Sequence, residues 1–241
     1  MTYIPAPKDK RLVWYLSMEE YLAQHVQEDL FFTWVVPPTV IFGRHQVMEN
    51  EVNVPFCEAH GVQMYRRKSG GGCVYSDEGN LMLSYITADT HSEQVFQRYL
   101  DTMTEALRAL GFAAAKSEHN DILIGDRKVS GNACYALPTG TIVHGTLLYD
   151  VNFEALQQAI TPSAAKLAKH GVQSVRQRVT NLKSIATTTE LGGKVLADGI
   201  DALAAFFAEY LCTSRRLLTP ADIAAIDAIE QTYLAPAFIR G

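Results

Sequence analysis

A glycine-rich turn between two apolar segments constrains this chain more than any other feature. Residues 64–86 read MYRRKSGGGCVYSDEGNLMLSYI, with two adjacent arginines before three glycines. Glycine lets the backbone approach a ligand closely, and successive amide N–H groups in such a turn form a concave site for phosphate or carboxylate. Because side chains alternate along a strand, we expect only one of Arg66 and Arg67 to point into that site. The pattern alone leaves two interpretations open, an anion-binding loop or an ordinary tight turn.

Known phosphate motifs do not fit this turn. A P-loop has Lys-Ser or Lys-Thr after its glycines, and none follows here. The dinucleotide motif needs Gly-x-Gly-x-x-Gly at the start of a helix, which is also absent from the sequence. An anion-binding loop in this chain would therefore be of another kind.

Composition narrows the class of protein. The chain has 241 residues, 48% of them hydrophobic and 20% charged, which is typical of a soluble globular protein. A net charge of −5 with scattered Lys and Arg gives no basic face, so we expect no nucleic-acid partner. No segment approaches the roughly 20 apolar residues that span a bilayer, and the N-terminal residues lack a signal-peptide core. We expect a cytoplasmic protein without a membrane partner.

Cysteine and histidine spacing argues against a structural metal. The cysteines Cys57, Cys73, Cys134 and Cys212 are far apart and form no C-x-x-C pair, so neither a zinc site nor a disulfide framework is indicated. The seven histidines show no metal-ligand spacing. We expect reduced thiols.

Hydrophobic periodicity predicts short strands interrupted by a few helices. A capping-box pattern at Ser17 and Glu20 predicts a helix from about Ser17. Residues 30–43 predict two strands in a hairpin-like unit, broken at Pro37-Pro38. Further helices are expected over 50–61, 92–112, 151–160, 199–211 and 219–234, with Thr219 as the last N-cap, and further strands over 62–67, 81–88 and 141–151.

The segment 120–133, NDILIGDRKVSGNA, predicts a β-hairpin that turns at Gly125-Asp126. In that register Asp121, Leu123, Lys128 and Ser130 share one face, with about 7 Å between Asp121 and Lys128. A carboxylate, an ammonium and a hydroxyl group would then form a candidate site, unless a one-residue slip separates them. The alternative is that Lys128 is an ordinary solvated residue.

Four stretches together resemble the lipoate–protein ligase A family. They are PPTVIFGRHQ (37–46), RRKSGGGCVYSDEGN (66–80), NDILIGDRKVSGNA (120–133) with HGTLL (144–148), and KLAKHGVQSVRQRVTNL (166–182). The resemblance covers about residues 12–185 and implies an α+β fold with a mixed, mostly antiparallel sheet flanked by helices, as in the biotin and lipoate ligase catalytic domain. We expect one catalytic domain over residues 1–241, with a helical C-terminal part over about 195–241 and no accessory domain.

The resemblance also implies an activity. ATP would adenylate lipoate, and the lipoyl group would pass from lipoyl-AMP to a lysine of an apo lipoyl domain, in a 2-oxo acid dehydrogenase complex or the glycine-cleavage H protein. ATP and Mg²⁺ are the implied cofactors and lipoate the substrate. Lys128 matches the catalytic lysine that holds the lipoyl carboxylate and the AMP phosphate, and Asp121 is the most plausible Mg²⁺ contact.

Further site residues follow from the same resemblance. The residues implied to bind ATP or lipoyl-AMP are Arg67, Ser69, Gly70, Gly71, Gly72, Cys73, Val74, Tyr75, Asn80, Asn120, Asp121, Lys128, Ser130, Gly131 and Ala133. The residues expected along the lipoyl group are Val40, Phe42, Gly43, Arg44, His144, Gly145 and Leu147, with Tyr75 as a further lining residue.

Departures from the family pattern keep alternatives open. Ser76 precedes Asp77 where a histidine is frequent, and Cys73 stands where alanine is common. A separate accessory subunit could supply adenylation, or the chain could transfer lipoyl or octanoyl groups between carriers or from lipoyl-AMP alone. In a thioester route Cys134 is the candidate nucleophile, although residues 160–163 lack the cysteine of that class. A non-catalytic protein that binds lipoyl-AMP or a lipoyl domain is the alternative of another class.

Overall fold

A large mixed sheet carries most of the chain in the computed structural model, which describes residues 1–160 and 179–240. Within these residues eight strands pair in the order β11-β1-β2-β6-β10-β9-β8-β7. The strands are β1 (Thr2–Tyr3), β2 (Leu30–Trp34), β6 (Asn80–Thr87), β7 (Ala114–Lys116), β8 (Asp121–Ile124), β9 (Arg127–Leu137), β10 (Gly140–Leu148) and β11 (Ser214–Arg215). Among these eight strands β1 pairs in parallel with β2 and β11, and the other pairs are antiparallel. The expected α+β fold with a mostly antiparallel sheet is confirmed.

Three further strands form a small second sheet in the order β4-β3-β5. They are β3 (Thr39–Phe42), β4 (Gln63–Arg66) and β5 (Val74–Ser76). The glycine-rich turn therefore links two strands of this small sheet, from the end of β4 to the start of β5. The two ends of the turn are held in place because β4 and β5 both pair with β3.

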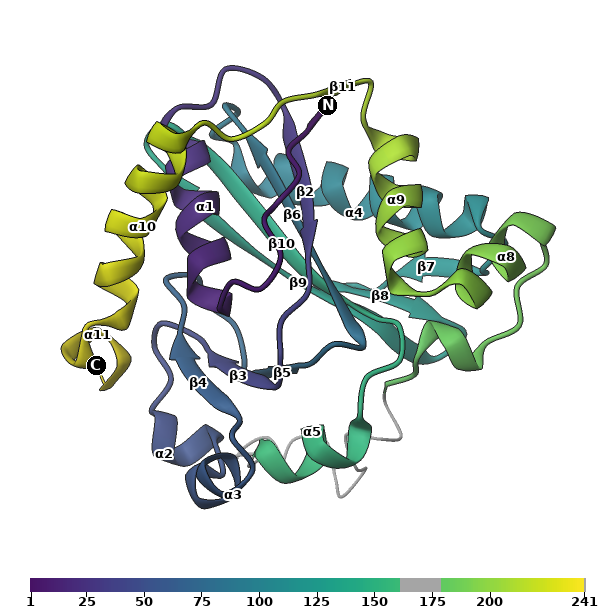
Figure 1. The fold of residues 1–241 in the computed structure, drawn as a ribbon. Helices are drawn as coiled ribbons and strands as arrows, with labels where there is room; N and C mark the ends of the chain where they lie inside the picture. The colour runs from purple at the N-terminus through teal and green to yellow at the C-terminus, as the bar shows by residue number, and fades with distance from the viewer. Residues whose placement is uncertain (161–178, 241) are drawn as a thin grey trace.

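Helices cover both faces of the large sheet (Figure 1). One side, which we call the α1 face, packs against α1 (Leu12–Gln24) and α10 (Pro220–Leu234), and the other, the α4 face, packs against α4 (Ser92–Ala109) and α9 (Ile200–Leu211). The remaining helical segments are α2 (Met48–Glu51), α3 (Val54–Ala59), α5 (Phe153–Ala159), a 3-10 turn at Leu182–Ser184, α8 (Glu190–Asp198) and α11 (Pro236–Arg240).

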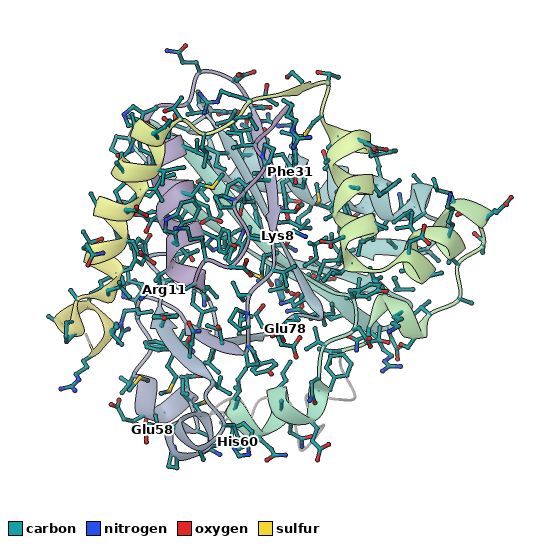
Figure 2. The ribbon with its side chains drawn as sticks, viewed as in Figure 1. Lys8, Arg11, Phe31, Glu58, His60 and Glu78 are labelled. Carbon is teal, nitrogen blue, oxygen red and sulfur yellow. The ribbon has the colours of Figure 1, made fainter. Side chains whose placement is uncertain are left out.

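Side-chain alternation along the strands sorts the core into these two layers. On β2, Phe31 packs into the core of the α4 face, whereas Phe32 and Trp34 pack into that of the α1 face. Figure 2 shows side chains filling the space on both sides of the sheet, with Phe31 inside, and Glu58 and His60 on the outer surface of α3. The same alternation determines which site residues can lie on one face of the sheet.

The predicted start of the first helix is wrong. Helix α1 begins at Leu12, and Ser17 lies inside it, fully buried, with its Oγ donating to the Val13 carbonyl oxygen at 2.8 Å. The apolar run 12–16 packs between the sheet and α10, and this burial outweighs the local capping signal.

The predicted hairpin over residues 30–43 is also wrong. Strand β2 pairs with β1 and β6 in the large sheet, whereas β3 pairs with β4 and β5 in the small one. Pro37-Pro38 lies where the chain passes from one sheet to the other. Both edges of each strand are occupied by segments distant in sequence, which local pattern does not reveal.

The β8–β9 hairpin has the predicted turn but contains a bulge. Ile124 pairs with Arg127 and Leu123 with Lys128, as expected, but the register then shifts. Asp121 consequently faces Gly131 rather than Ser130. Alternation turns Ser130 to the opposite face, where its Oγ donates to Asn132 Oδ1 at 3.3 Å, so its expected place beside Lys128 is wrong.

Other predicted elements agree with the structure. Helix α4 is the long amphipathic helix expected over 92–112, and Gly111 after it has a φ of 86°. Thr219 caps α10 in a capping box with Asp222. The stretch 166–178 of the fourth family-like motif, together with Thr161, Pro162 and Ser163, lies outside the described residues. None of the helices that the structure describes has the length and apolar character to cross a bilayer.

Candidate functional site

The centre of strand β10 gathers polar groups on the α1 face. His144 lies opposite Ser84 of β6 and Ala133 of β9, and Thr146 lies opposite Gly131 of β9. Directly opposed residues project to the same face of a sheet. His144, Thr146 and Gly131 therefore form one surface, about 7 Å from row to row.

Hydrogen bonds join His144 to the glycine-rich turn and to helix α1. Its Nδ1 lies 2.8 Å from Glu19 Oε2, and its Nε2 lies 2.9 Å from Ser69 Oγ. Ser84 Oγ donates to Glu19 Oε1 at 2.5 Å and accepts from Trp34 Nε1 at 2.9 Å. We call these five residues the His144 network. An ionised carboxylate only accepts a hydrogen bond, so Nδ1 is the ring nitrogen that donates to Glu19.

Arg67 shapes the glycine-rich turn from inside. Its side chain is buried, and it donates to the Gly70 and Gly72 carbonyl oxygens at 2.8 and 2.7 Å and to the Ile41 carbonyl oxygen at 3.2 Å. Burial lowers the pKa of this guanidinium group to about 10. No carboxylate pairs with it among the residues that the structure describes. A buried cation without a counter-ion makes this loop favourable for an anion.

Arg66 points the other way, as strand alternation predicts. Its Nη1 donates to the Arg44 and Gln46 carbonyl oxygens at 2.9 and 2.7 Å, so it fixes the loop after β3. That loop touches the glycine-rich turn directly, because Arg44 N donates to Ser69 O at 3.0 Å. A Cβ at Gly43 would lie 2.3 Å from the Gly71 carbonyl oxygen, so only glycine allows this approach.

Lys128 lies over a glycine beside a carboxylate. Its Nζ is 2.8 Å from Asp121 Oδ1, and both side chains are about one-third exposed. A Cβ placed on Gly131 would be 2.5 Å from Nζ, so the ammonium group occupies the space above this glycine. Asp121 Oδ1 has no hydrogen-bond partner in the described part of the chain, so the contact is an ion pair without hydrogen-bond alignment. Lys128 is thus held near a site that a ligand could also reach.

The residues implied to bind the nucleotide fall into exposed, half-buried and buried groups. Gly70, Gly71 and Gly72 are exposed, with Gly71 at a φ of 93°. Asn80 is buried and its Oδ1 has no partner among the described residues. Asn120 is exposed. Its Nδ2 donates to the Asn132 carbonyl oxygen and its own carbonyl oxygen accepts from Asn132 N, so it stabilises the position of strand β9. The remaining ones are Cys73 and Val74, half-buried in the turn and the start of β5, and Ala133, half-buried opposite His144.

The residues expected along a lipoyl group do not all meet. His144 lies on the α1 face and Arg44 is exposed, but Val40, Phe42 and Tyr75 are buried in a third core with α3 and α5. Side chains of the small sheet form much of that core, and its member Val179 forms an isolated β-bridge with Lys128.

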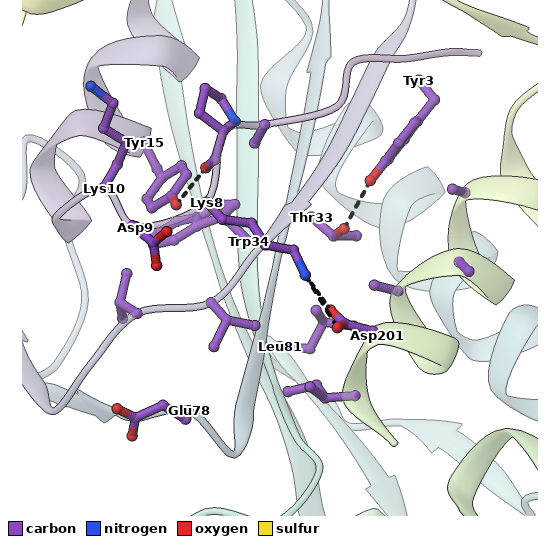
Figure 3. Close-up of a pocket in the computed structure, with 18 of the residues that line it drawn as sticks. Tyr3, Lys8, Asp9, Lys10, Tyr15, Thr33, Trp34, Glu78, Leu81 and Asp201 are labelled. Carbon is purple, nitrogen blue, oxygen red and sulfur yellow. Dashed lines mark hydrogen bonds and ion pairs between the residues drawn. The ribbon is translucent and has the colours of Figure 1, made fainter. Parts of the chain in front are cut away.

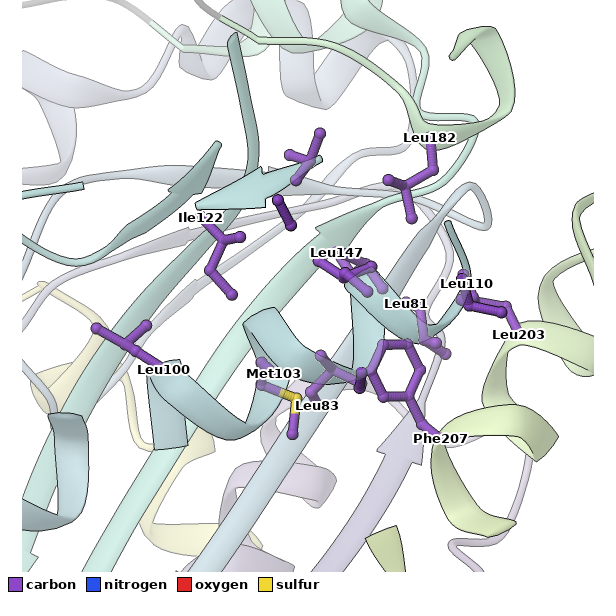
Figure 4. Close-up of a cluster of buried hydrophobic side chains, with 14 of the residues drawn as sticks. Leu81, Leu83, Leu100, Met103, Leu110, Ile122, Leu147, Leu182, Leu203 and Phe207 are labelled. Carbon is purple, nitrogen blue, oxygen red and sulfur yellow. The ribbon is translucent and has the colours of Figure 1, made fainter. Parts of the chain in front are cut away.

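Leu147 and Gly145 belong to the opposite face. Leu147 is 1% exposed in the core of the α4 face, in the cluster that also holds Met103 and Phe207 (Figure 4). A Cβ at Gly145 would lie 2.0 Å from Asn132 Oδ1, so this glycine admits a neighbouring side chain. Leu147 and His144 therefore lie on opposite faces of the sheet, because strand residues alternate.

Cys134 lies away from Lys128 as well. It pairs with Val143, packs against the core of the α4 face, and its Sγ is 3.9 Å from the Ser92 carbonyl oxygen. Burial raises the pKa of its thiol to about 11. A reactive cysteine needs the opposite shift, so this position does not favour a nucleophile.

Sequence analysis missed Glu19, Trp34, Ser84 and Thr146. A signal was present for two of them, since Ser84 interrupts an apolar strand and Glu19 falls within a run of buried helix residues. Their partners are 65 and 125 residues away in sequence, which only the fold brings together.

A metal ion would find few protein ligands here. No group of three or more His, Cys, Asp or Glu side chains suited to a metal occurs in residues 1–160 and 179–240. Asp121 is a single carboxylate already beside Lys128. Mg²⁺ would fit only with phosphate oxygens and water as most of its ligands, which is its usual preference.

A cavity of about 1410 Å³ lies between the N-terminal segment, β2 and α9, and Trp34 is the member of the His144 network that lines it (Figure 3). None of the site residues expected from the sequence lines it. Lys8 and Asp201 pair across it at 3.1 Å, and its charged residues are of both signs. We assign the candidate site to the convergence of the His144 network, the glycine-rich turn and Lys128 instead, because charged and glycine groups suited to an anion meet there.

Comparisons with known proteins place the chain in a family. The model of the lipoyl protein ligase A/B catalytic domain matches residues 13–197. Lipoate–protein ligase 1 of Staphylococcus aureus is 37% identical over 171 residues, covering 70% of this chain and 52% of the relative. Lipoate-protein ligase LplJ of Bacillus subtilis is 37% identical over 171 residues, covering 69% and 51%. The chain thus spans about half the length of the curated relatives it matches.

Solved structures share the fold. A bi-partite lipoate protein ligase from Thermoplasma acidophilum, studied with its E2 lipoyl domain, matches with a TM-score of 0.81 at 21% identity, covering 100% of this chain and 96% of that one. A lipoate-protein ligase A bound with ATP matches with a TM-score of 0.76 at 20% identity, covering 99% and 96%. At such identities the likeness shows the fold alone.

Proposed function

Because the chain belongs to the lipoyl protein ligase A/B catalytic domain family, we propose that it is a lipoate–protein ligase. In this proposal ATP adenylates the carboxylate of lipoate, and the lipoyl group then passes to a lysine of an apo lipoyl domain. Curated relatives carry the name lipoate–protein ligase, and one solved structure of the fold holds lipoic acid while another holds ATP. The acceptor would be a lipoyl domain of a 2-oxo acid dehydrogenase complex or a glycine-cleavage H protein.

The placement of Lys128 over Gly131 is the observation that carries the proposal. Attack of a carboxylate oxygen on the α-phosphorus expels pyrophosphate and concentrates negative charge on phosphoryl oxygens. A fixed cation and backbone amides stabilise that charge most effectively. The Lys128 ammonium is a compact charge, and among the described residues its side chain pairs with Asp121 in a poorly aligned ion pair. It can turn from Asp121 to the lipoyl carboxylate and the phosphate.

The second step uses the same groups. The acceptor amine attacks the lipoyl carbonyl carbon, the carbon–oxygen bond to phosphate breaks, and AMP leaves with the electron pair. Lys128 beside the phosphate favours that departure by neutralising charge on the leaving group. Lys128 stays a cation throughout and forms no covalent bond.

The glycine-rich turn suits the phosphate. Gly70, Gly71 and Gly72 are exposed, and the buried Arg67 beneath them has no carboxylate partner in the described residues. Backbone amides over a buried positive charge attract an anion. Mg²⁺ would accompany the ATP phosphates, with Asp121 as its candidate protein contact.

A second candidate is transfer from lipoyl-AMP alone, with adenylation dependent on a separate accessory subunit. The bi-partite description of the Thermoplasma acidophilum ligase favours a test of the two steps separately. Carrier-to-carrier transfer through a Cys134 thioester is disfavoured, because burial raises the thiol pKa and Cys134 faces away from Lys128.

The test incubates the purified chain with an apo lipoyl domain in two tubes and weighs the acceptor by intact-mass spectrometry. One tube contains lipoate, ATP and Mg²⁺, and the other contains synthetic lipoyl-AMP. A lipoyl adduct in both tubes supports a self-sufficient ligase, and an adduct only with lipoyl-AMP supports transfer with adenylation elsewhere. No adduct in either tube would overturn the proposed function.

A further inference from the structure

The C-terminal helices lie directly beside the first helix (Figure 1). Helix α10 buries Ile226 and Tyr233 against α1, and Trp14 Nε1 donates to Asp227 Oδ1 at 2.7 Å. Tyr21 of α1 donates to Asp222 near the start of α10. These contacts dock the helix, and nothing in the proposed chemistry uses them.

The end of α10 makes a different kind of contact, because it reaches the glycine-rich turn. Tyr233 Oη donates to Glu20 Oε2 at 3.1 Å, and Lys68 Nζ lies 2.6 Å from the same oxygen and 2.9 Å from Oε1. The Lys68 ammonium also lies 4.6 Å from the centre of the Tyr233 ring. Glu20 therefore joins the last turn of α10 to the first residue of the loop.

These groups are shielded from water. Tyr233 is 3% exposed, and the side chains of Glu20 and Lys68 are 13% and 22% exposed. Burial raises the pKa of Tyr233 far above its usual value, so its phenol stays protonated and donates to Glu20. A charged hydrogen bond in such surroundings is stronger than one on an open surface.

The contact is adjacent to the His144 network on both sides. Lys68 precedes Ser69, which bonds to His144, and Glu20 follows Glu19, which bonds to the same ring. Glu20 thus binds Lys68 directly, and Glu19 is connected to Ser69 through His144. Misplacing Glu20 would loosen the loop at its first residue.

Helix α11 reaches the other side of the loop. The Ile239 carbonyl oxygen accepts from Arg66 Nε at 3.1 Å, and the same guanidinium group holds the Arg44 and Gln46 carbonyls. The C-terminal segment therefore contacts residues just before the glycines at two points, through Tyr233 and through Ile239.

We propose that Tyr233 is a positioning residue for ligand binding by the glycine-rich turn: its hydroxyl orients Glu20, and Glu20 holds Lys68 so that residues 69–72 are arranged before the ligand arrives. The ligand class, an adenylate, rests on the proposed function. A loop arranged in advance costs less to order on binding, so the effect falls on affinity rather than on the chemical step.

The test compares two phenol deletions on the same pair of helices. Tyr233→Phe keeps the ring over Lys68 and removes the hydroxyl, and Tyr21→Phe removes an equivalent phenol-to-carboxylate bond away from the loop. Loss of one hydrogen bond to a charged group predicts a KM for lipoyl-AMP at least about 10-fold higher in Tyr233→Phe with kcat unchanged. Tyr21→Phe should leave both constants as in the unmodified chain.

Hydrogen exchange of the ligand-free protein gives a readout that does not depend on activity. Amides of the peptide containing residues 66–74 should exchange at least about threefold faster in Tyr233→Phe than in Tyr21→Phe, as expected when a local contact is lost. Lys68→Met should reproduce the faster exchange, and Lys68→Arg, which keeps the ion pair, should restore slow exchange.

Equal exchange in the two phenylalanine variants would overturn the proposal, and so would a fall in kcat with KM unchanged. If the unmodified chain transfers no lipoyl group, the proposed function fails, yet the exchange experiment still decides whether Tyr233 positions the loop.

Discussion

Replacing Gly131 by alanine tests the placement of Lys128 without touching its charge. The new Cβ would lie 2.5 Å from Lys128 Nζ and 2.7 Å from Cε, whereas ordinary contacts of a Cβ begin at 3.4 Å. The ammonium must therefore move by about 1 Å, and a displacement of that size in a catalytic group costs on the order of 100-fold in rate. The clash is with the end of a flexible side chain, so the fold should accept it, with a change in unfolding free energy within about 1 kcal/mol.

The assay is transfer from synthetic lipoyl-AMP to an apo lipoyl domain, followed by intact mass, with a thermal unfolding curve for each variant. Gly193→Ala is the matched control, because a Cβ there meets nothing within 4 Å and the residue lies in helix α8. We expect Gly131→Ala to lose about 100-fold in kcat at nearly unchanged Tm, and Gly193→Ala to keep full activity. Near-normal transfer by folded Gly131→Ala would refute the reasoning that Lys128 acts from above this glycine.

Three further groups, Lys128, Arg67 and Cys134, are each tested singly. Lys128→Ala should lower transfer by about 10²- to 10³-fold with Tm retained, and Lys128→Arg should not restore it, because a planar guanidinium does not replace a compact charge; both are read by the same mass assay. Arg67→Lys should lose hydrogen bonds to buried carbonyls worth about 2–4 kcal/mol, or roughly 5–10 °C in Tm, and should abolish the rise in Tm that lipoyl-AMP causes in the unmodified chain. Burial raises the pKa of Cys134 to about 11, so its thiol stays protonated as pH rises until that value is approached. Iodoacetamide at pH 8, followed by peptide mapping, should modify it at least about 10-fold more slowly than in the unfolded chain, and Cys134→Ser should keep transfer activity.

Local features of the sequence were sufficient for several elements. The helical periodicity of 92–109 and the capping box of Thr219 depend on contacts within a few residues, and both are found in the structure. The turn at Gly125-Asp126 is also local, since Gly125 has the φ of 64° that such a turn requires. Elements that depend on such short-range interactions can be predicted without knowledge of the fold.

Long-range features could not be obtained in this way. The bulge between Ile122 and Leu123 shifts the register by one residue, which moved Ser130 away from Lys128 and placed Gly131 under it. The turn residues do not encode that shift, because it arises where β9 must also pair with β10. The same holds for the His144 network, whose members come from a helix, three strands and a loop.

Arg67 has a structural role in the glycine-rich turn besides the phosphate contact that the resemblance implies. The resemblance implies that it contacts phosphate, but its Nε, Nη1 and Nη2 donate to the carbonyl oxygens of Gly70, Gly72 and Ile41. In a trans peptide the carbonyl and the following N–H point in opposite directions, and the described chain contains no cis bond. Turning the Gly70 carbonyl inward therefore turns the Gly71 N–H outward, toward the exposed side of the loop. A planar fork that binds several carbonyls at once can hold the peptide units in this orientation, and a lysine cannot. The guanidinium thus supplies both the buried charge and the direction of the amides, which is why Arg67→Lys should remove the effect of ligand on stability.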